Sequence, residues 1–119
     1  MLRNGVDLIE IDRLEKIDPK IRHRFINRVF SDEEKLICGN NNSCYAARFA
    51  AKEAVSKALG TGIGEIHWKD IEILRGEKGQ PVIHLHAKAK EREIALGITN
   101  WAISISHSRT VAIAFVIAQ

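Results

Sequence analysis

The sequence predicts an α+β fold in which a mainly antiparallel sheet wraps against one long buried helix. An alanine-rich segment over residues 44–59 has the length and composition of that helix. Residues 101–107 and 110–118 both carry alternating apolar side chains, which predicts a closing antiparallel hairpin. The chain has 119 residues, of which 45% are apolar, so we expect residues 1–119 to form one domain.

A strand is predicted near the start of the chain, over residues 5–11. In strand geometry Asp7 shares a face with Ile9 and Ile11, so it is the one acid on an otherwise apolar face. Such an acid either caps a turn at the edge of the strand or meets a partner that offsets its charge.

The next part of the chain is predicted to be helical. An apolar residue recurs at every fourth position over residues 17–29, which predicts a helix interrupted near Pro19. Ser31 and Glu34 have the spacing of a capping box and predict the start of a second helix. After a polar loop, the long helix follows and ends at Gly60.

The second half of the chain is predicted to contain most of the strands. Residues 66–74 and 81–87 have the composition of two strands around a glycine-containing turn. A short helix over residues 88–96 then leads to the closing hairpin.

The charges of the chain are nearly balanced, with 18 Lys and Arg residues against 15 Asp and Glu residues. One stretch is largely basic and contains Arg13, Lys16, Lys20, Arg22, Arg24 and Arg28. A basic face of this kind favours an acidic partner. Aromatic residues make up only 6% of the chain and are not interleaved with the basic ones, which argues against a nucleic-acid-binding module.

Export and membrane insertion are not expected. The longest apolar run, residues 110–118, is strand-sized, and Asp7 stands where a signal peptide would carry its apolar stretch. Cys38 and Cys44 lack CxxC spacing and a nearby histidine, so we expect two free thiols and a cytoplasmic protein.

Glu53 is the first candidate for chemistry. One interpretation is a solvent-exposed pair with Lys57, one helical turn away. The small apolar residues around Glu53 favour burial instead, where a carboxylate needs a cation or hydrogen-bond donors. If Asp7 converges with Glu53, the two carboxylates repel each other unless a cation joins them. Magnesium is the natural candidate, because it takes one or two carboxylates together with substrate phosphates.

Basic residues also lie along the long helix. Arg48 and Lys52 are one turn apart, and with Lys57 they form either a solvated charge stripe or a cradle for phosphate. The glycine-rich segment 60–64 would let a phosphate approach the backbone but lacks the P-loop pattern. His107, at the tip of the closing hairpin, is either a polar turn residue or a contact for a phosphate or a proton.

The chain resembles the holo-acyl-carrier-protein synthases, the short bacterial 4′-phosphopantetheinyl transferases. Their signature helix is similar to residues 48–62, which read RFAAKEAVSKALGTG. Three further stretches match in order and spacing, at residues 5–7, 30–34 and 104–108. The sequence departs from the family at Arg3, where relatives often carry a glycine.

The resemblance implies the 4′-phosphopantetheinyl transferase fold and an enzyme that uses coenzyme A. Members of this family move phosphopantetheine onto a serine of apo-acyl carrier protein and release adenosine 3′,5′-bisphosphate, which supports fatty acid biosynthesis. They need magnesium, and their metal carboxylates match Asp7 and Glu53. They are homotrimers whose active sites lie between neighbouring subunits.

The reaction that the resemblance implies also suggests roles for individual acidic and basic residues. Glu53 and Lys57 are expected to be catalytic, with Lys57 reaching a pyrophosphate oxygen beside the metal. Arg48 and His107 are expected to bind the 3′-phosphate of coenzyme A, with His107 donated across a subunit interface. The acceptor of the serine proton stays open between Glu53, a metal-bound water and a substrate phosphate oxygen.

Arg13 and Arg24 match positions that are basic in relatives. Because acyl carrier proteins are small and strongly acidic, we expect them to dock on these residues. A non-catalytic trimeric scaffold is a further alternative to an enzyme, after the nucleic-acid-binding module, but it gives no reason for an acid on the apolar face of the first strand.

Overall fold

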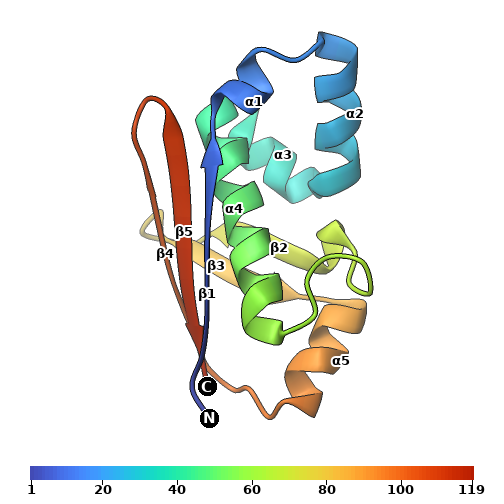
Figure 1. Cartoon of the computed structure of the whole chain (residues 1–119), viewed down its shortest axis with the longest axis vertical. Coiled ribbons are helices and arrows are strands. Elements are labelled where there is room, and N and C mark those ends of the chain that lie inside the picture. The colour runs from blue at the N-terminus through green and yellow to red at the C-terminus, as the bar shows by residue number, and fades with distance from the viewer.

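The long helix α4 (Asn42–Leu59) lies at the centre of the structure, with the strands β1, β4 and β5 along one side and shorter helices near its two ends (Figure 1). The computed structural model describes all 119 residues. Along the chain the elements are β1 (Arg3–Glu10), α1 (Asp12–Glu15), α2 (Pro19–Val29), α3 (Asp32–Cys38), α4 (Asn42–Leu59), the 3-10 helix η1 (Trp68–Asp70), β2 (Ile71–Arg75), β3 (Pro81–Leu85), α5 (Ala87–Ala95), β4 (Trp101–His107) and β5 (Val111–Ala118). Both sheets are antiparallel, which confirms the predicted α+β class.

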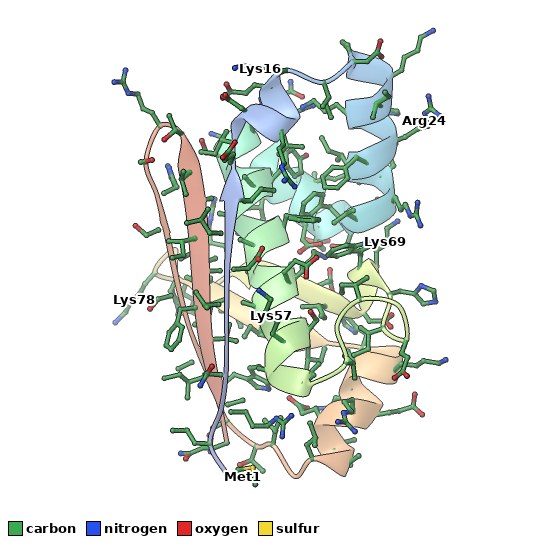
Figure 2. The ribbon with its side chains drawn as sticks, viewed as in Figure 1. Met1, Lys16, Arg24, Lys57, Lys69 and Lys78 are labelled. Atoms are coloured by element: carbon green, nitrogen blue, oxygen red, sulfur yellow. A yellow bond between two sulfur atoms is a disulfide. The ribbon has the colours of Figure 1, made fainter.

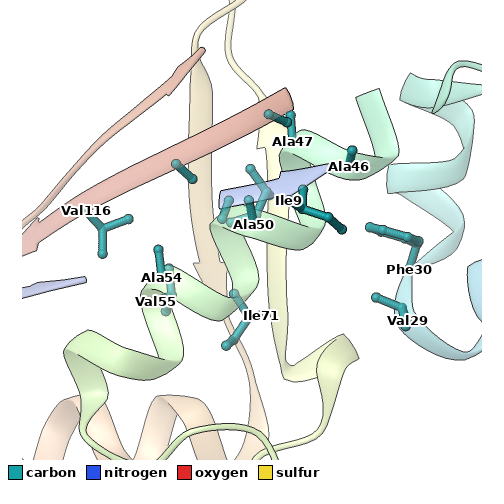
Figure 3. Packing of buried hydrophobic residues seen from close by; sticks show 14 of the residues in the cluster. Ile9, Val29, Phe30, Ala46, Ala47, Ala50, Ala54, Val55, Ile71 and Val116 are labelled. Carbon is teal, nitrogen blue, oxygen red and sulfur yellow. The ribbon is translucent and has the colours of Figure 1, made fainter. Parts of the chain in front are cut away.

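The three-stranded sheet has the order β1-β5-β4 and packs one face against α4. Small side chains line that contact: Ala50 and Ala54 on the helix and Ala114 on the central strand are all fully buried. Figure 3 shows Ala54 and Val55 of α4 facing Val116 of β5. The alanine-rich composition therefore lets the helix and the sheet approach closely.

Gly5 permits the closest approach between β1 and α4. A Cβ atom at this position would lie only 1.9 Å from the carbonyl oxygen of Ala54, so no side chain fits there. Side chains alternate along a strand, so Asp7 points to the same side as Gly5 and faces the helix. This geometry explains why a glycine stands two residues before the acid.

The predicted helix boundaries are confirmed to within a few residues. The helical segment is interrupted between α1 and α2, just before Pro19, as predicted. Ser31 and Glu34 form the predicted capping box. The helix α4 begins two residues earlier than predicted, because the side chain of Asn41 accepts a hydrogen bond from the backbone of Cys44 at 2.9 Å. None of the helices combines the length and apolar character needed to span a membrane.

Two arginines cap the C-terminal end of α4. Arg3 donates from Nε to the carbonyl of Ala58 at 2.5 Å, and Arg92 of α5 donates to the carbonyl of Leu59 at 3.0 Å. Both guanidinium groups satisfy carbonyls that the helix leaves unpaired, and their charge suits the negative end of its dipole. Arg3, which stands where relatives often carry a glycine, thus stabilises the C-terminal end of α4.

Cys38 and Cys44 form a disulfide, so the prediction of two free thiols is wrong. Gly39 adopts a φ of +57° and turns the chain after α3, and the hydroxyl of Tyr45 donates to the Gly39 carbonyl at 2.6 Å. This corner brings the two Cα atoms to 5.4 Å, within reach of a disulfide. A rule based on CxxC spacing cannot detect a pair that a helix–turn–helix corner brings together.

Candidate active site

Two acids and a lysine gather where β1 crosses α4. Asp7 lies on the inner face of β1, and Glu53 and Lys57 lie one turn apart on the helix. Lys57 points toward β1 (Figure 2), where its Nζ donates to the carbonyl of Val6 at 2.8 Å and lies 3.3 Å from Oδ1 of Asp7. The ion pair of Lys57 is therefore with the strand, and the interpretation of a surface pair with Glu53 is wrong.

The partly buried Glu53 carboxyl has a perturbed acidity. Burial raises its pKa above the ordinary value, the negative charge of Asp7 raises this pKa further, and Lys57 partly offsets both effects. The structure thus brings Asp7 and Glu53 close enough to repel each other. No third acid, histidine or cysteine completes a metal-binding group with them. Two converging carboxylates suit magnesium, which retains waters and accepts substrate phosphates.

A second cluster lies at the start of α4, around Arg48. We call it the arginine hollow: a cavity of about 400 Å³ whose lining includes Arg48, Arg75, His107 and Cys44. Arg48 is only 7% exposed, and its Nε donates to the carbonyl of Ile73 at 2.8 Å. Arg48 is thus held against β2, whereas His107 enters the lining from the exposed end of β4.

The arginine hollow is electropositive. Burial lowers the pKa of Arg48, the positive charge of Arg75 lowers it further, and the carboxylate of Glu34 opposes both effects. None of the residues that line the hollow is acidic. An anion would relieve the repulsion between the two guanidinium groups, so the hollow is suited to a phosphate.

The acids and the arginine hollow lie on different sides of α4. Lys57 bonds to β1, whereas Arg48 bonds to β2. The structure therefore brings Asp7, Glu53 and Lys57 into one group and Arg48 and His107 into another, and these groups share no lining residue.

Lys52 belongs to neither cluster. Its side chain is fully buried, and its Nζ donates to Glu34 at 2.8 Å, to the Trp68 carbonyl at 3.0 Å and to the Ile71 carbonyl at 2.6 Å. These three bonds use all the donors of an ammonium group. Both interpretations of Lys52, as part of a solvated stripe and as part of a phosphate cradle, are wrong.

The sequence analysis did not single out Arg75. An arginine at the end of a short strand has no spacing signal of its own. Only its position in the structure, across the hollow from Arg48, reveals it as a candidate for binding an anion.

The basic residues expected to contact a partner are exposed on α1 and α2. Arg13 and Arg24 are both exposed, and Arg24 projects away from the molecule (Figure 2). Arg13 lines a mainly apolar groove of about 150 Å³, together with Ile17, Ile21 and Phe25, whereas Arg24 lies outside this lining on the same helix as Ile21 and Phe25. Positive charge beside an apolar groove is an arrangement typical of a protein-docking surface.

Comparisons with known proteins find relatives over nearly the whole chain. The family model described as the 4′-phosphopantetheinyl transferase superfamily matches residues 3–115. A holo-acyl-carrier-protein synthase from Natranaerobius thermophilus is 50% identical over 113 residues, which cover 92% of this chain and 90% of that protein. One from Herpetosiphon aurantiacus is 44% identical over 126 residues, covering 100% of this chain and 99% of the relative. A crystal structure of the Helicobacter pylori holo-acyl-carrier-protein synthase in complex with coenzyme A matches with a TM-score of 0.87 at 38% identity, covering 98% of this chain and 99% of that one.

The fold is an antiparallel sheet packed on a buried alanine-rich helix, and the site has paired acids beside a lysine. Together with the family match, these features define a 4′-phosphopantetheinyl transferase. Within that superfamily, the chain belongs to the holo-acyl-carrier-protein synthase family and is an enzyme of that type. The resemblance identified from the sequence is therefore confirmed.

Proposed function

We propose that this chain transfers 4′-phosphopantetheine from coenzyme A to a serine of an apo-acyl carrier protein, and that the reaction supports fatty acid biosynthesis in the cytoplasm. The observation that carries the proposal is the convergence of Asp7 and Glu53 beside Lys57. The names of the relatives support the acceptor, and the coenzyme A complex of the Helicobacter pylori protein supports the donor.

Asp7 and Glu53 would hold magnesium. Burial and the negative charge of Asp7 raise the pKa of Glu53, and the positive charge of Lys57 opposes this shift. A divalent cation would relieve the repulsion between the two carboxylates. When magnesium is bound, the chemistry it supplies is neutralisation of charge on the pyrophosphate of coenzyme A.

Lys57 is the residue of this chain that would contact the pyrophosphate. Its side chain is about half exposed, at 52%, so its ammonium can reach a ligand without leaving its place beside Asp7. In the transfer, the serine hydroxyl loses its proton to one of the three acceptors considered above, and its oxygen forms a bond to the phosphorus that carries the pantetheine. The bond from that phosphorus to the adenosine 3′,5′-bisphosphate oxygen breaks, and Lys57 stabilises the negative charge on the leaving phosphate.

The arginine hollow would hold the 3′-phosphate of coenzyme A. Arg48 uses Nε and Nη1 for contacts within the chain, which leaves Nη2 to donate to a phosphate oxygen. Arg75 and His107 add further positive or hydrogen-bonding groups at the same hollow. Because the hollow and the paired acids lie on different sides of α4, one coenzyme A would contact the acids of one subunit and the hollow of the next.

A homotrimer would provide that arrangement. The outer face of the three-stranded sheet is apolar and exposed: Val6 and Leu8 are 47% and 57% exposed, and Ile113 and Phe115 are 38% and 42% exposed. A contiguous apolar face of this kind favours burial against further copies of the chain. The exposed Arg13 and Arg24 remain on the helices, where an acidic carrier protein would dock.

The intact mass of an apo-acyl carrier protein tests the proposal. After incubation with this protein, coenzyme A and magnesium, the carrier should gain the mass of one phosphopantetheine, and a chelator should prevent the gain. Glu53→Gln serves as the matched negative control, because it keeps the shape of the side chain and removes the charge. A gain that persists with chelator would contradict the metal dependence, and no gain with coenzyme A bound would contradict the choice of acceptor.

A further inference from the structure

The Cys38–Cys44 disulfide lies at the edge of the arginine hollow, and the proposed function makes no use of it. Cys44 contributes to the lining of the hollow, and its Sγ accepts a hydrogen bond from Nη1 of Arg48 at 3.2 Å. Cys38 is only 5% exposed and lies at the end of α3. One sulfur of the pair is thus in contact with a residue proposed to bind anions, and the other is buried behind it.

The surroundings of Cys44 favour a thiolate when the disulfide is reduced. Cys44 is the third residue of α4, at the positive end of the dipole of an 18-residue helix. Arg48 contacts its sulfur, Arg75 and His107 face the same hollow, and no acid lines it. Cys38 is at the opposite, negative end of its own helix and is buried, so its thiol should remain protonated.

We propose that Cys44 is a redox-active cysteine, and that its bond with Cys38 controls how tightly the arginine hollow binds an anion. In the oxidised protein the sulfur next to Arg48 is neutral, so the guanidinium is available to a phosphate. In the reduced protein the Cys44 thiolate pairs with Arg48 and lowers the positive charge of the hollow. The identity of the anion, the 3′-phosphate of coenzyme A, rests on the proposed function.

The oxidation step uses a small disulfide as the oxidant. The Cys44 thiolate attacks one sulfur of the disulfide RSSR, forms the mixed disulfide Cys44–SR and releases one thiolate RS⁻. Cys38, which only Cys44 can reach, then loses its proton and attacks the Cys44 sulfur, releasing the second RS⁻. Two protein sulfurs are oxidised and one RSSR is reduced to two thiols. The proton of Cys38 goes to one released RS⁻, and the other RS⁻ takes from the solvent the proton that Cys44 gave up when it ionised.

The reactivity of Cys44 is tested first, in a way that does not depend on what the hollow binds. The protein is reduced, freed of reductant and treated with limiting iodoacetamide at about pH 7, where an ordinary thiol is mostly protonated. Peptide mass analysis should find Cys44 alkylated at least about tenfold faster than Cys38. Equal rates, or faster labelling of Cys38, would overturn the proposal.

The effect on binding is tested with adenosine 3′,5′-bisphosphate by calorimetry. Reduction of the wild-type protein should weaken binding by about three- to tenfold, the value of one charge-assisted contact at a partly exposed site. The difference should shrink as the pH is lowered, because the Cys44 thiolate then takes up a proton and no longer competes with the anion for Arg48.

Two serine variants separate the charge of the thiolate from the loss of the covalent bond. Cys38→Ser cannot form the disulfide but keeps the Cys44 thiol, so it should bind as weakly as the reduced wild-type protein under all conditions. Cys44→Ser also lacks the bond but has no thiolate, so it should bind more tightly than Cys38→Ser.

Equal weakening in both variants would overturn the charge mechanism in favour of simple loosening of α4. Unchanged wild-type affinity on reduction would overturn the coupling. If the nucleotide binds neither redox form, the proposed use of the hollow fails and the coupling fails with it, whereas selective labelling would still establish Cys44 as the reactive thiol.

Discussion

Lys57 and Asp7 form an ion pair of 3.3 Å that joins the last turn of α4 to the inner face of β1. The same ammonium group donates to the carbonyl of Val6 at 2.8 Å, so two groups of β1 hold it in place. Glu53, one turn earlier on the helix, has no such partner. This asymmetry explains why burial and the charge of Asp7 leave Glu53 with a raised pKa.

Replacing Glu53 by glutamine should abolish transfer and stabilise the metal-free fold. Because folding raises the pKa of Glu53, its protonated form is favoured in the folded state. That contribution is complete below the unfolded pKa of about 4.3 and is lost as the pH rises through the folded value. At about pH 7 the ionised carboxylate therefore destabilises the protein, and a neutral Glu53→Gln side chain does not.

Thermal unfolding in the presence of a chelator checks this prediction. The Tm of Glu53→Gln should exceed that of the wild-type protein at about pH 7, and the difference should disappear near pH 4, below the ordinary pKa. Magnesium should raise the Tm of the wild-type protein only. Glu77→Gln, at an exposed acid in the turn between β2 and β3, is the matched control and should change little. A lower Tm for Glu53→Gln at neutral pH would contradict the argument.

Replacing Asp7 by asparagine should move the pKa of Glu53 part of the way back toward its ordinary value. The substitution removes the repulsion but not the burial, and burial is the larger of the two causes. The pKa of the Glu53 carboxyl can be followed directly by carbon-13 NMR during a pH titration without metal. Glu10→Gln, on the outer face of the same strand, should leave this pKa unchanged. An unshifted Glu53 in Asp7→Asn would show that the two acids do not interact.

Local patterns in the sequence were sufficient to predict most elements of the fold. Three such patterns depend only on residues close together in the sequence, and the structure has all three. They are the apolar period of four in α2, the capping box at Ser31 and the glycine that ends α4. The approach of Asp7 to Glu53 was also predictable, because an acid on an apolar strand face and an acid on a buried helix both need a partner.

The features that could not be predicted depend on contacts between distant segments. Lys52 and Lys57 have the same side chain on the same helix, yet one is fully buried and the other is half exposed. Only the packing of α3 and β2 against α4 separates them. The Cys38–Cys44 bond likewise depends on the angle between two helices, for which the sequence has no spacing rule.

The buried Lys52–Glu34 pair should be critical for stability. Lys52→Met would leave the Glu34 carboxylate buried without its counter-ion, although Glu34 would still accept a backbone hydrogen bond from Ile73 at 2.9 Å. Removing one partner of a buried ion pair typically costs about 3–5 kcal/mol in the free energy of unfolding. Urea denaturation measures the loss.

A double variant distinguishes loss of the charge partner from loss of packing. In Lys52→Met with Glu34→Gln, neither group carries a charge, so part of the lost free energy of unfolding should return. Lys57→Met, which removes a half-exposed lysine from the same helix, should cost less than about 1 kcal/mol. If Glu34→Gln lowers the free energy of unfolding as much in the Lys52→Met protein as in the wild-type protein, the two charges do not act as a pair.

Reversing the charge at Arg13 and Arg24 should weaken use of the carrier protein while leaving nucleotide binding intact. Both residues are exposed on the side of the molecule where α1 and α2 lie, and Arg13 also lines the apolar groove. Charges at the rim of an interface mainly steer association, so Arg13→Glu with Arg24→Glu should raise the KM for apo-carrier by about tenfold or more. The dependence of this KM on salt should become shallower, because fewer favourable charge pairs remain to be screened.

Steady-state kinetics at several ionic strengths, together with calorimetry of adenosine 3′,5′-bisphosphate, measure both effects. The matched control reverses two exposed lysines elsewhere, Lys78→Glu in the β2–β3 turn and Lys88→Glu on α5, and changes the net charge by the same amount. If the control raises the KM equally, net charge alone guides the carrier. If nucleotide affinity falls together with carrier use, the arginines support the fold or the active site, and the docking surface must lie elsewhere.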